Sequence, residues 1–273
     1  MPLVLDTNKT HKTTITVTVI TVCKNAEDTI EETIKSVLNQ TYENIEYIII
    51  DGKSTDKTLF LINKYKRKIS YIKSEKDNGI YHAMNKGIKA ANGSILFFLN
   101  ANDTLYNKHV VKKVIDTFLN TDVDIVYGDV LMKSYKSRKP LYRKYQKFTK
   151  SFLYYDHLPH QSTAYKKTLF IKYGDYKNTY KILADYDWSL RVILKSNVKL
   201  LYIATPISIC SIGGISTDQQ HIELSRKEAN LIRKKYFTLY ERIFYRVNIN
   251  NIIRKLRWFR YLRHESIYHE KSF

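Results

Sequence analysis

Between residues 15 and 127, short apolar runs alternate with stretches in which apolar residues recur at helical spacing. β-Branched and aromatic residues dominate the runs, as in strands that are buried on both faces. The strands predicted from these runs cover residues 15–22, 45–50, 69–73, 95–99 and 123–127. The helices predicted between them cover residues 26–38, a short stretch after the polar turn 51–56, and residues 80–91 and 108–119. This alternation predicts an α/β fold with a Rossmann-like, mostly parallel sheet flanked by helices.

Polar residues follow the apolar runs where the strands are expected to end. Asp51 follows the second run, Asn100-Ala101-Asn102-Asp103 the fourth, and Asp129 the fifth. In an open α/β sheet, ligands bind beyond the carboxyl ends of the strands. Carboxylate and amide oxygens there suit Mg²⁺ or Mn²⁺ shared with a phosphate, although the same residue types also favour plain turns. The sequence has no GxGxxG and no P-loop motif, so neither type of phosphate loop is expected.

A second polar cluster lies between residues 156 and 191. It comprises Asp156, His160-Gln161-Ser162 and Ala184-Asp185-Tyr186-Asp187-Trp188, the last of which begins a predicted helix. Asp185 and Asp187 are two positions apart, so they cannot share one face of that helix. We therefore expect one of them to point into the site and the other to cap the helix or lie on the surface.

Two regions are strongly basic. Residues 133–150 carry eight Lys and Arg, no acid and interleaved aromatic residues, which fits either a flexible flap over a phosphorylated substrate or a solvated strand pair. Residues 219–264 are helical in pattern, basic and aromatic. They fit equally an amphipathic helix pair on an anionic membrane and helices packed on the domain with a charged outer face. The apolar window 198–216 is interrupted by Lys199 and Pro206, so short buried strands are expected there instead of a membrane span.

Composition adds an anionic partner to this picture. The 273 residues carry a net charge of +20, which favours binding to nucleotide phosphate, nucleic acid or an acidic membrane face. The two cysteines, Cys23 and Cys210, lack the spacing of a metal site or a disulfide framework, and a reducing cytoplasm fits them best. Residues 1–14 are rich in Thr and Lys and do not resemble a signal peptide.

Taken together, the motifs resemble those of family 2 glycosyltransferases of the GT-A fold, in particular the bacterial enzymes that build capsule, O-antigen and colanic-acid-type polysaccharides. The resemblance covers about residues 15–217 and is carried by TVCKNAEDTIEETIKSVLNQTYENIEYIIIDGKSTDKT (21–58), SEKDNGIYHAMNKGIKAANGSILFFLNANDTL (74–105), IVYGDV (125–130), HQSTAYKKTLF (160–170), ADYDWSLR (184–191) and GGIST (213–217). It implies an inverting transfer from a nucleotide-diphosphate sugar to a hydroxyl group, with Mn²⁺ or Mg²⁺ as cofactor.

The resemblance also implies roles for individual residues. Asp185 matches the catalytic acid of the family, which takes the proton from the acceptor hydroxyl, and Asp103 matches the metal ligand of the DxD-type motif. Contacts with the nucleotide sugar are implied for Val22, Lys24, Asn25, Asp51, Asp77 and Asn102. Contacts with the acceptor or the diphosphate are implied for His160, Asp187, Gly214 and Ser216.

The chain departs from the family pattern at several positions. Gly52 stands where many members have a second acid that contacts uracil, so UDP is less secure as the carrier. Asn100 and Asn102 stand where Asp is common, which leaves one carboxylate in the metal motif and implies weaker metal binding or reliance on the diphosphate. His82 stands where related chains often have Asp, and we expect it on the surface or a pocket rim.

We expect four parts: a tail (1–14), a nucleotide-sugar-binding half (15–130), an acceptor-binding half (131–218) and a basic helical extension (219–273). The family implies a lipid-linked saccharide acceptor and a cytoplasmic protein that is peripheral on the inner face of the cytoplasmic membrane. An anionic membrane surface is then a partner, nucleic acid is not, and a homodimer is left open. The alternatives are a basic nucleic-acid-binding protein, which leaves the acids at successive strand ends unexplained, and a nucleotidyltransferase on a similar sheet.

Overall fold

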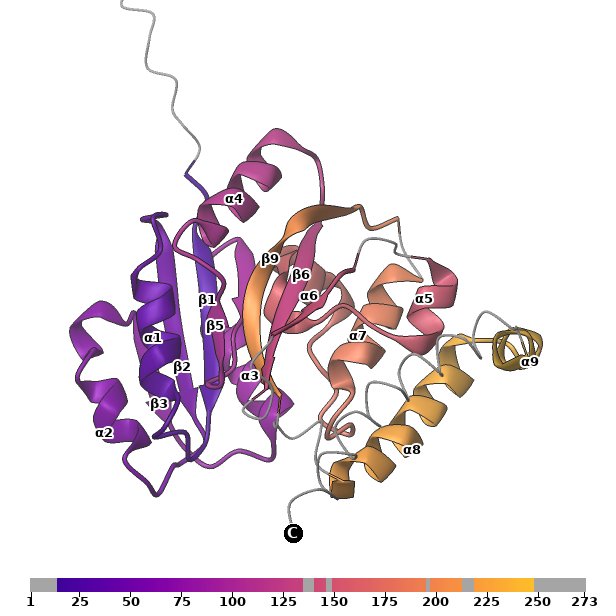
Figure 1. Cartoon of the computed structure of the whole chain (residues 1–273), viewed down its shortest axis with the longest axis horizontal. Helices are drawn as coiled ribbons and strands as arrows, with labels where there is room; N and C mark the ends of the chain where they lie inside the picture. Colours follow the sequence, from indigo (N-terminus) through magenta and orange to yellow (C-terminus); the bar gives the residue numbers. More distant parts are fainter. Residues whose placement is uncertain (1–13, 135–139, 146–148, 195–196, 213–218, 248–273) are drawn as a thin grey trace, which may run out of the picture.

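The computed structural model describes residues 14–134, 140–145, 149–194, 197–212 and 219–247. Within these ranges nine strands form one sheet with helices on both faces (Figure 1). The strands are β1 (Val17–Cys23), β2 (Ile45–Asp51), β3 (Tyr71–Ser74), β4 (Ile95–Phe98), β5 (Asp103–Leu105), β6 (Ile125–Ser134), β7 (Leu141–Arg143), β8 (Thr163–Lys166) and β9 (Leu200–Ile212). The α-helices are α1 (Ile30–Leu38), α2 (Thr58–Asn63), α3 (Ile80–Ala90), α4 (Val110–Asn120), α5 (Lys150–Tyr155), α6 (Lys167–Tyr173), α7 (Ala184–Ile193), α8 (Gln219–Tyr236) and α9 (Leu239–Val247), and η1 (Lys66–Lys68) and η2 (His160–Ser162) are 3₁₀ helices.

The first four strands form the parallel sheet that the sequence predicts. β1 lies between β2 and β4, and β3 pairs with the outer side of β2, all in parallel. All seven residues of β1 are buried, because helices cover both faces of the sheet. Val17 and Val19 pack in one core with α1, α2 and α4, whereas Ile20 and Val22 pack in the other with α3, α6 and α7.

Beyond β4 the sheet becomes mixed, with antiparallel pairs that the local sequence pattern does not predict. The strand order is β3-β2-β1-β4-β8-β6-β9-β5, with β7 on β6. β8 inserts antiparallel between β4 and β6 because the segment after η2 returns along the sheet, and β5 and β7 also pair antiparallel. β6 pairs in parallel with β9. The α/β fold class itself is confirmed.

The sequence predicts that Asp129 follows the fifth strand, but in the structure it lies inside β6. Its position coincides with a shift in the register of β6 with β9. Its carboxylate is buried and accepts hydrogen bonds from Tyr145 N (3.0 Å) and from the hydroxyl groups of Tyr142 and Tyr202 (both 2.8 Å). Asp129 therefore anchors the described part of the basic region 133–150, which includes the antiparallel pair β6–β7. Residues 135–139 and 146–148 of that region lie outside the described ranges.

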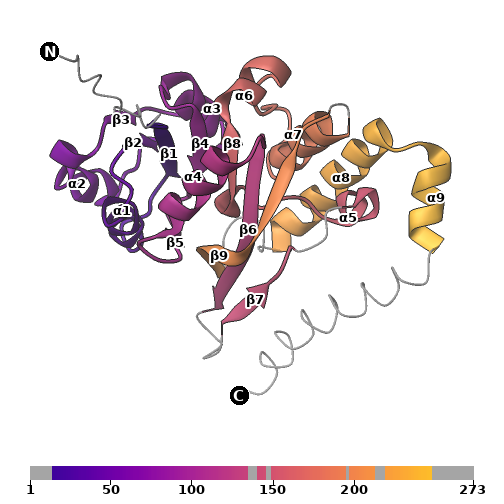
Figure 2. The same ribbon diagram turned by 90° about the horizontal axis from the view of Figure 1, so that it is seen from above.

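Helix α8 packs against α5 and α7. Figure 2 shows α8 running alongside α7, with α9 turned away at the end of the molecule. A third hydrophobic core joins α5, α7 and α8 and includes Leu153, Tyr186, Leu190, Ile232 and Phe237. No described helix is both long and apolar enough to cross a membrane. The apolar window 198–216 forms the strand β9 over its described part, so a strand is confirmed there, but as one long element.

Candidate active site

The carboxyl ends of β1, β2 and β4 lie side by side and form the edge at which the sequence places the nucleotide. Cys23 at the end of β1 pairs with Asp51 at the end of β2. Beyond β4, Leu99 N donates to Ile20 O (2.9 Å) and Ala101 N donates to Val22 O (3.3 Å), so this segment follows β1 to the edge. The Val22 side chain itself is buried in the core. Only the backbone of Val22 is therefore placed to meet a nucleotide.

Asp51 is fully buried and holds the loop that follows β2. Its carboxylate accepts hydrogen bonds from Ser54 N (3.1 Å), from Ser54 Oγ and from Ser74 Oγ (2.6 Å). Asn25 lies beside this loop with a φ of 48°, and its Oδ1 accepts from Thr55 N (2.9 Å). Lys24 and Asn25 are exposed at the rim. The polar edge is thus fixed by internal hydrogen bonds while its rim stays accessible.

Gly52 is required by the position of Asp77. A Cβ atom at residue 52 would lie 2.4 Å from Asp77 Oδ2, which is closer than real contacts allow. Asp77 is itself fixed, because its Oδ1 accepts from Gly79 N (3.0 Å) ahead of α3. An acid at position 52 would therefore displace Asp77, which gives a physical reason for the departure at Gly52.

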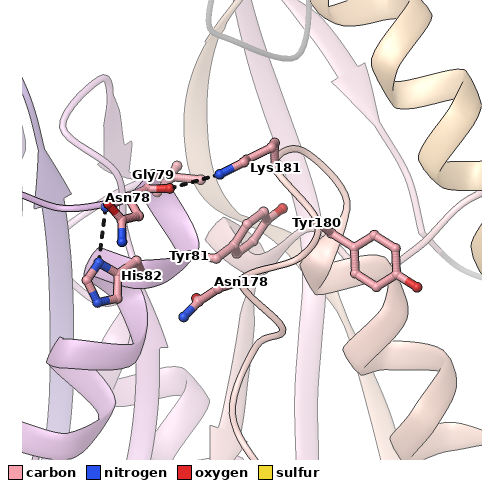
Figure 3. Close-up of a pocket in the computed structure, with 8 residues that line it drawn as sticks. Asn78, Gly79, Tyr81, His82, Asn178, Tyr180 and Lys181 are labelled. Carbon is pink, nitrogen blue, oxygen red and sulfur yellow. Dashed lines mark hydrogen bonds between the residues drawn. The ribbon is translucent and has the colours of Figure 1, made fainter.

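A small hollow lies at the N-terminal end of α3, between that helix and the loop before α7 (Figure 3). Lys181 Nζ reaches across it to Asn78 O (3.4 Å). His82 lies on its rim, where Nδ1 accepts from Asn78 N (3.1 Å), in line with its expected position. The hollow therefore lies between the start of α3 and the loop that carries Lys181.

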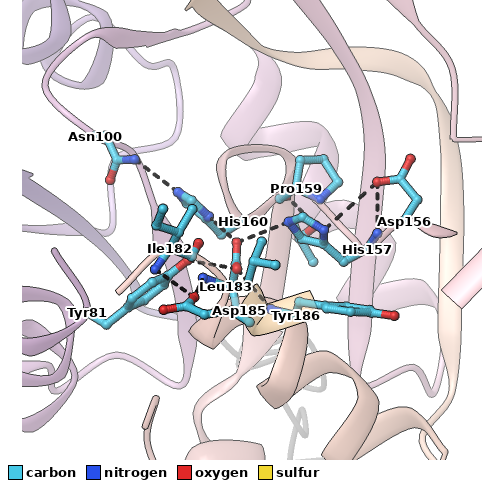
Figure 4. Close-up of polar contacts among 12 residues, drawn as sticks. Tyr81, Asn100, Asp156, His157, Pro159, His160, Ile182, Leu183, Asp185 and Tyr186 are labelled. Atoms are coloured by element: carbon cyan, nitrogen blue, oxygen red, sulfur yellow. Dashed lines mark hydrogen bonds and ion pairs between the residues drawn. The ribbon is translucent and has the colours of Figure 1, made fainter. Parts of the chain in front are cut away.

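The carboxylate of Asp185 is contacted by side chains from several elements (Figure 4). It lies in the first turn of α7 and is 5% exposed. Its Oδ2 lies 2.9 Å from His160 Nδ1 and 3.3 Å from His157 Nε2. Its Oδ1 lies 2.8 Å from the Tyr81 hydroxyl and accepts from Tyr186 N (2.9 Å). Residues from α3, from the segment before β8 and from α7 thus meet at one carboxyl group.

These contacts set the charge of the group. Burial alone would raise the pKa of Asp185, but the His157 and His160 rings outweigh burial and hold that pKa well below its usual range. For His157 the balance is reciprocal: burial lowers the pKa of its ring, and Asp185 more than compensates, so that the pKa is raised. Asp185 is consequently an ionised carboxylate at neutral pH.

His160 links Asp185 to the nucleotide edge. Its Nε2 lies 3.0 Å from Asn100 Nδ2, directly after β4, while its Nδ1 contacts Asp185. The chain Asn100–His160–Asp185 runs from the end of the parallel sheet to the N-terminus of α7. A reacting group at this point would meet both halves of the molecule.

Asp103, the predicted metal ligand, faces away from the rim. It is 4% exposed, belongs to β5 and pairs with Cys210 of β9. Burial raises the pKa of Asp103 to about 6, although His160, Cys210 and Gln161 oppose the rise. Asn102 is the exposed residue of the motif, and its Oδ1 accepts from Thr29 Oγ1 (2.7 Å). The described residues contain no group of three His, Cys, Asp or Glu able to hold a metal ion, so they fit a protein-held Mn²⁺ or Mg²⁺ poorly.

One of Asp185 and Asp187 was expected to cap the helix or lie on the surface. Asp187 does neither. It is completely buried, and its Oδ1 accepts from Lys235 Nζ (2.6 Å) and from the Tyr236 hydroxyl (3.1 Å). Both partners belong to α8, and Arg191 of α7 lies 3.9 Å from the other carboxylate oxygen. Gly214 and Ser216 lie outside the described residues.

Tyr81 and His157 contact Asp185, and Glu228 binds the backbone just before it at Ile182 and Leu183; the sequence predicted none of the three. Tyr81 lies beside His82 in the motif IYHAMNKG, and His157 follows Asp156. Their position next to these motif residues was the available signal for both. Glu228 sits in a basic helix 43 positions beyond Asp185. No pattern in the sequence connects it with the site.

Comparison with known proteins agrees with this geometry. The family model described as glycosyl transferase family 2 matches residues 18–173. A PGL/p-HBAD biosynthesis glycosyltransferase of Mycobacterium bovis is 32% identical over 187 residues, which are 66% of this chain and 71% of that protein. The UDP-Glc:alpha-D-GlcNAc-diphosphoundecaprenol beta-1,3-glucosyltransferase WfaP of Escherichia coli is 43% identical over 88 residues, 32% of this chain and 35% of that protein.

Solved structures share the fold. S. aureus TarS 1-349, in complex with UDP-GlcNAc, superposes with a TM-score of 0.65 at 17% identity, over 82% of this chain and 68% of that one. The mannosyltransferase PcManGT from Pyrobaculum calidifontis, in complex with GDP-Man and Mn²⁺, superposes with a TM-score of 0.57 at 16% identity, over 79% and 64%. The fold is therefore that of GT-A glycosyltransferases.

Proposed function

Because the chain belongs to glycosyl transferase family 2, we propose that it moves a sugar, with inversion, from a nucleotide-diphosphate sugar to a hydroxyl group of a lipid-linked saccharide. The observation that carries this proposal is the buried, ionised Asp185, joined through His160 to Asn100 at the nucleotide edge. WfaP, whose name gives a lipid diphosphate-linked sugar as acceptor, supports the choice of acceptor class. The pathway we propose is synthesis of a bacterial surface polysaccharide such as O-antigen or capsule.

The donor binds, in this proposal, across the ends of β1, β2 and β4. The backbone of Val22, the exposed Lys24 and Asn25, and the carboxylates of Asp51 and Asp77 surround that edge. Gly52 removes the second acid that contacts uracil in many members, so the nucleoside is not assigned. Asn102 lies exposed at the same edge, next to the position of the diphosphate.

The reaction proposed is a single displacement. The acceptor oxygen attacks the anomeric carbon, the bond from that carbon to the diphosphate oxygen breaks, and the nucleoside diphosphate leaves with the electron pair. Asp185 receives the hydroxyl proton. The Tyr81 hydroxyl has one hydrogen, which it can donate either to Asp185 Oδ1 (2.8 Å) or to Ile182 O (2.6 Å). Tyr81 can therefore leave Asp185 Oδ1 free to accept this proton. When Tyr81 donates to Ile182, one lone pair of Asp185 becomes available.

A divalent cation enters the proposal only as a partner of the donor diphosphate. Such a cation stabilises charge on a leaving diphosphate. The buried Asp103 and the amide of Asn102 do not form a carboxylate site for it. Asp103 remains the residue that the DxD-type motif assigns as metal ligand.

The membrane partner proposed is an anionic surface, the inner face of the cytoplasmic membrane. α9 supports it with an exposed apolar stripe at helical spacing, and none of its residues is buried. The stripe consists of Leu239 (65% exposed), Tyr240 (77%), Ile243 (53%), Phe244 (50%) and Val247 (69%). The opposite side of α9 is held by the domain, through Glu241 with Lys150 and through a ring contact of Tyr245 with Tyr154. Residues 248–264 of the sequence add five Arg and Lys and no acid.

The experiment that tests the function is thermal-shift screening against UDP, GDP, dTDP and CMP, each with and without Mn²⁺. The proposal expects stabilisation by one nucleoside diphosphate, followed by transfer of a radiolabelled sugar from the matching donor to a lipid-diphosphate-linked N-acetylglucosamine. Stabilisation by none of the four, together with no transfer, would reject the proposal.

A further inference from the structure

α7 begins without a cap of its own. Its N-cap residue is Leu183, whose side chain cannot accept a hydrogen bond from the first N–H groups of the helix. Asp185 lies in this first turn, so the position of its carboxyl group depends on how the turn is held. A helix N-terminus left without acceptors would fray, and the local geometry at Asp185 would be lost.

Glu228 of α8 holds the backbone immediately ahead of α7, up to the N-cap residue Leu183. Its Oε1 accepts from Lys181 N (2.6 Å), and its Oε2 accepts from Ile182 N (3.0 Å) and Leu183 N (2.9 Å). The residue is buried, with 4% of its surface exposed. One carboxylate thus binds the N–H groups of three consecutive residues just ahead of α7, close to the positive end of the helix, where negative charge is stabilising.

The segment held by Glu228 touches the catalytic carboxylate. Ile182 O accepts from the Tyr81 hydroxyl, which also lies 2.8 Å from Asp185 Oδ1 (Figure 4). Lys181 reaches the nucleotide half at Asn78 O (Figure 3). A displacement of residues 181–183 would therefore move Tyr81 and Asp185 relative to one another.

A second contact from α8 acts on the same turn. Lys235 Nζ and the Tyr236 hydroxyl both reach Asp187 Oδ1, two residues after Asp185. Hence α8 binds the segment before Asp185 through Glu228 and the residue Asp187 after it through Lys235. We propose that Glu228 is a positioning residue that fixes the Asp185 carboxyl group through the backbone of residues 181–183. This inference rests on the proposed function of Asp185 and adds to it an element from outside the region matched by the family model.

The test follows His157, because its ring reports the position of Asp185 without any substrate. NMR titration of the histidine side chains is compared in the wild type, Glu228→Gln, Glu223→Gln and Asp185→Asn. Glu223 is the matched control, since it lies on the same helix but is exposed and pairs only with Lys227 among the described residues. Asp185→Asn shows the result of losing the carboxylate, a midpoint of His157 that falls because burial of the ring is no longer offset by Asp185.

The inference expects the midpoint of His157 to fall in Glu228→Gln and to remain at the wild-type value in Glu223→Gln. A wild-type midpoint in folded Glu228→Gln overturns it. If Glu228→Gln does not fold, Glu228→Asp withdraws the carboxylate by one methylene, and the same comparison decides. Failure of the proposed function is seen separately, as undiminished release of UDP from UDP-glucose or of GDP from GDP-mannose by Asp185→Asn.

Discussion

His160 Nδ1 lies 2.9 Å from Asp185 Oδ2, although the two residues belong to different elements, η2 and α7. The other ring nitrogen of His160 faces Asn100, at the end of the central parallel strands. The imidazole therefore stands between the proposed base and the nucleotide edge, so that a change at either residue should affect the reaction more than the fold.

Asp185→Asn should abolish sugar transfer, with a loss of roughly 10²–10⁴-fold in kcat, because an amide cannot accept the acceptor proton. Affinity for the nucleoside diphosphate found by thermal shift should stay within about threefold, since Asp185 lies beyond the edge that holds the nucleotide. Isothermal titration calorimetry and a radiolabel transfer assay measure the two quantities. Asp116→Asn, an exposed site on α4, serves as control. Equal losses of binding and transfer would show that Asp185 is structural.

Asp103 should make stability depend on pH. Burial raises its pKa to about 6 in the folded protein, above the ordinary value of 3.8, so the folded state binds a proton that the unfolded state releases. The stability due to protonated Asp103 is present below about pH 4 and is lost as pH rises through 6. This loss amounts to roughly 3 kcal/mol. Urea unfolding from pH 4.5 to 7.5 should show a larger decline in the wild type than in Asp103→Asn, in which only groups such as His157, whose pKa is also raised, still contribute to the decline. An identical pH profile in the variant would contradict the assignment.

The sequence predicts the first half of the fold well because its signals there are local. Runs such as Ile95–Leu99 and the amphipathic stretches between them determine β1 to β4 and their helices. The insertion of β8 beside β4 depends on contacts such as Phe97 with Ala164, far apart in the chain, and no local pattern encodes it. Helix boundaries shift for the same reason, and α1 begins at Ile30 instead of residue 26.

In the site, too, local motifs identify some residues, and long-range packing determines the rest. The motifs name Asp185 and His160, and the structure brings them together. The motif also names Asp103, but periodicity could not show that its carboxyl group turns toward β9. Glu228 contacts Ile182 across 46 positions, and only the packing of α8 on α7 makes that contact possible.

Asn102 should gain metal binding when it is replaced by a carboxylate. Asn102→Asp places a charge at the exposed position of the motif, so Mn²⁺ should strengthen binding of the nucleoside diphosphate by about tenfold more than in the wild type. Calorimetric titrations with and without Mn²⁺ measure this effect. In Asp103→Asn the Mn²⁺ effect should remain at the wild-type level, because that side chain is buried. Loss of the effect in Asp103→Asn would instead make Asp103 the metal ligand that the motif implies.

Removal of residues 219–273 cannot test membrane binding cleanly. Ile232 and Phe237 are buried against α5 and α7, and Glu228 and Lys235 hold the first turn of α7. A chain ending near residue 218 should therefore lose stability, since truncating a single buried side chain of this size already costs about 2–5 kcal/mol. A surface substitution on α9 avoids this loss.

Phe244→Asp should weaken binding to anionic vesicles of phosphatidylglycerol by at least about tenfold, because it removes an aromatic ring from the exposed stripe and adds a negative charge. Co-sedimentation with vesicles at low and high salt measures the change. Phe60→Asp is the matched control: Phe60 is 65% exposed on α2, at the far end of the molecule from α9 (Figure 1), and its loss should leave vesicle binding intact. If both variants bind as the wild type, the stripe does not contact the membrane.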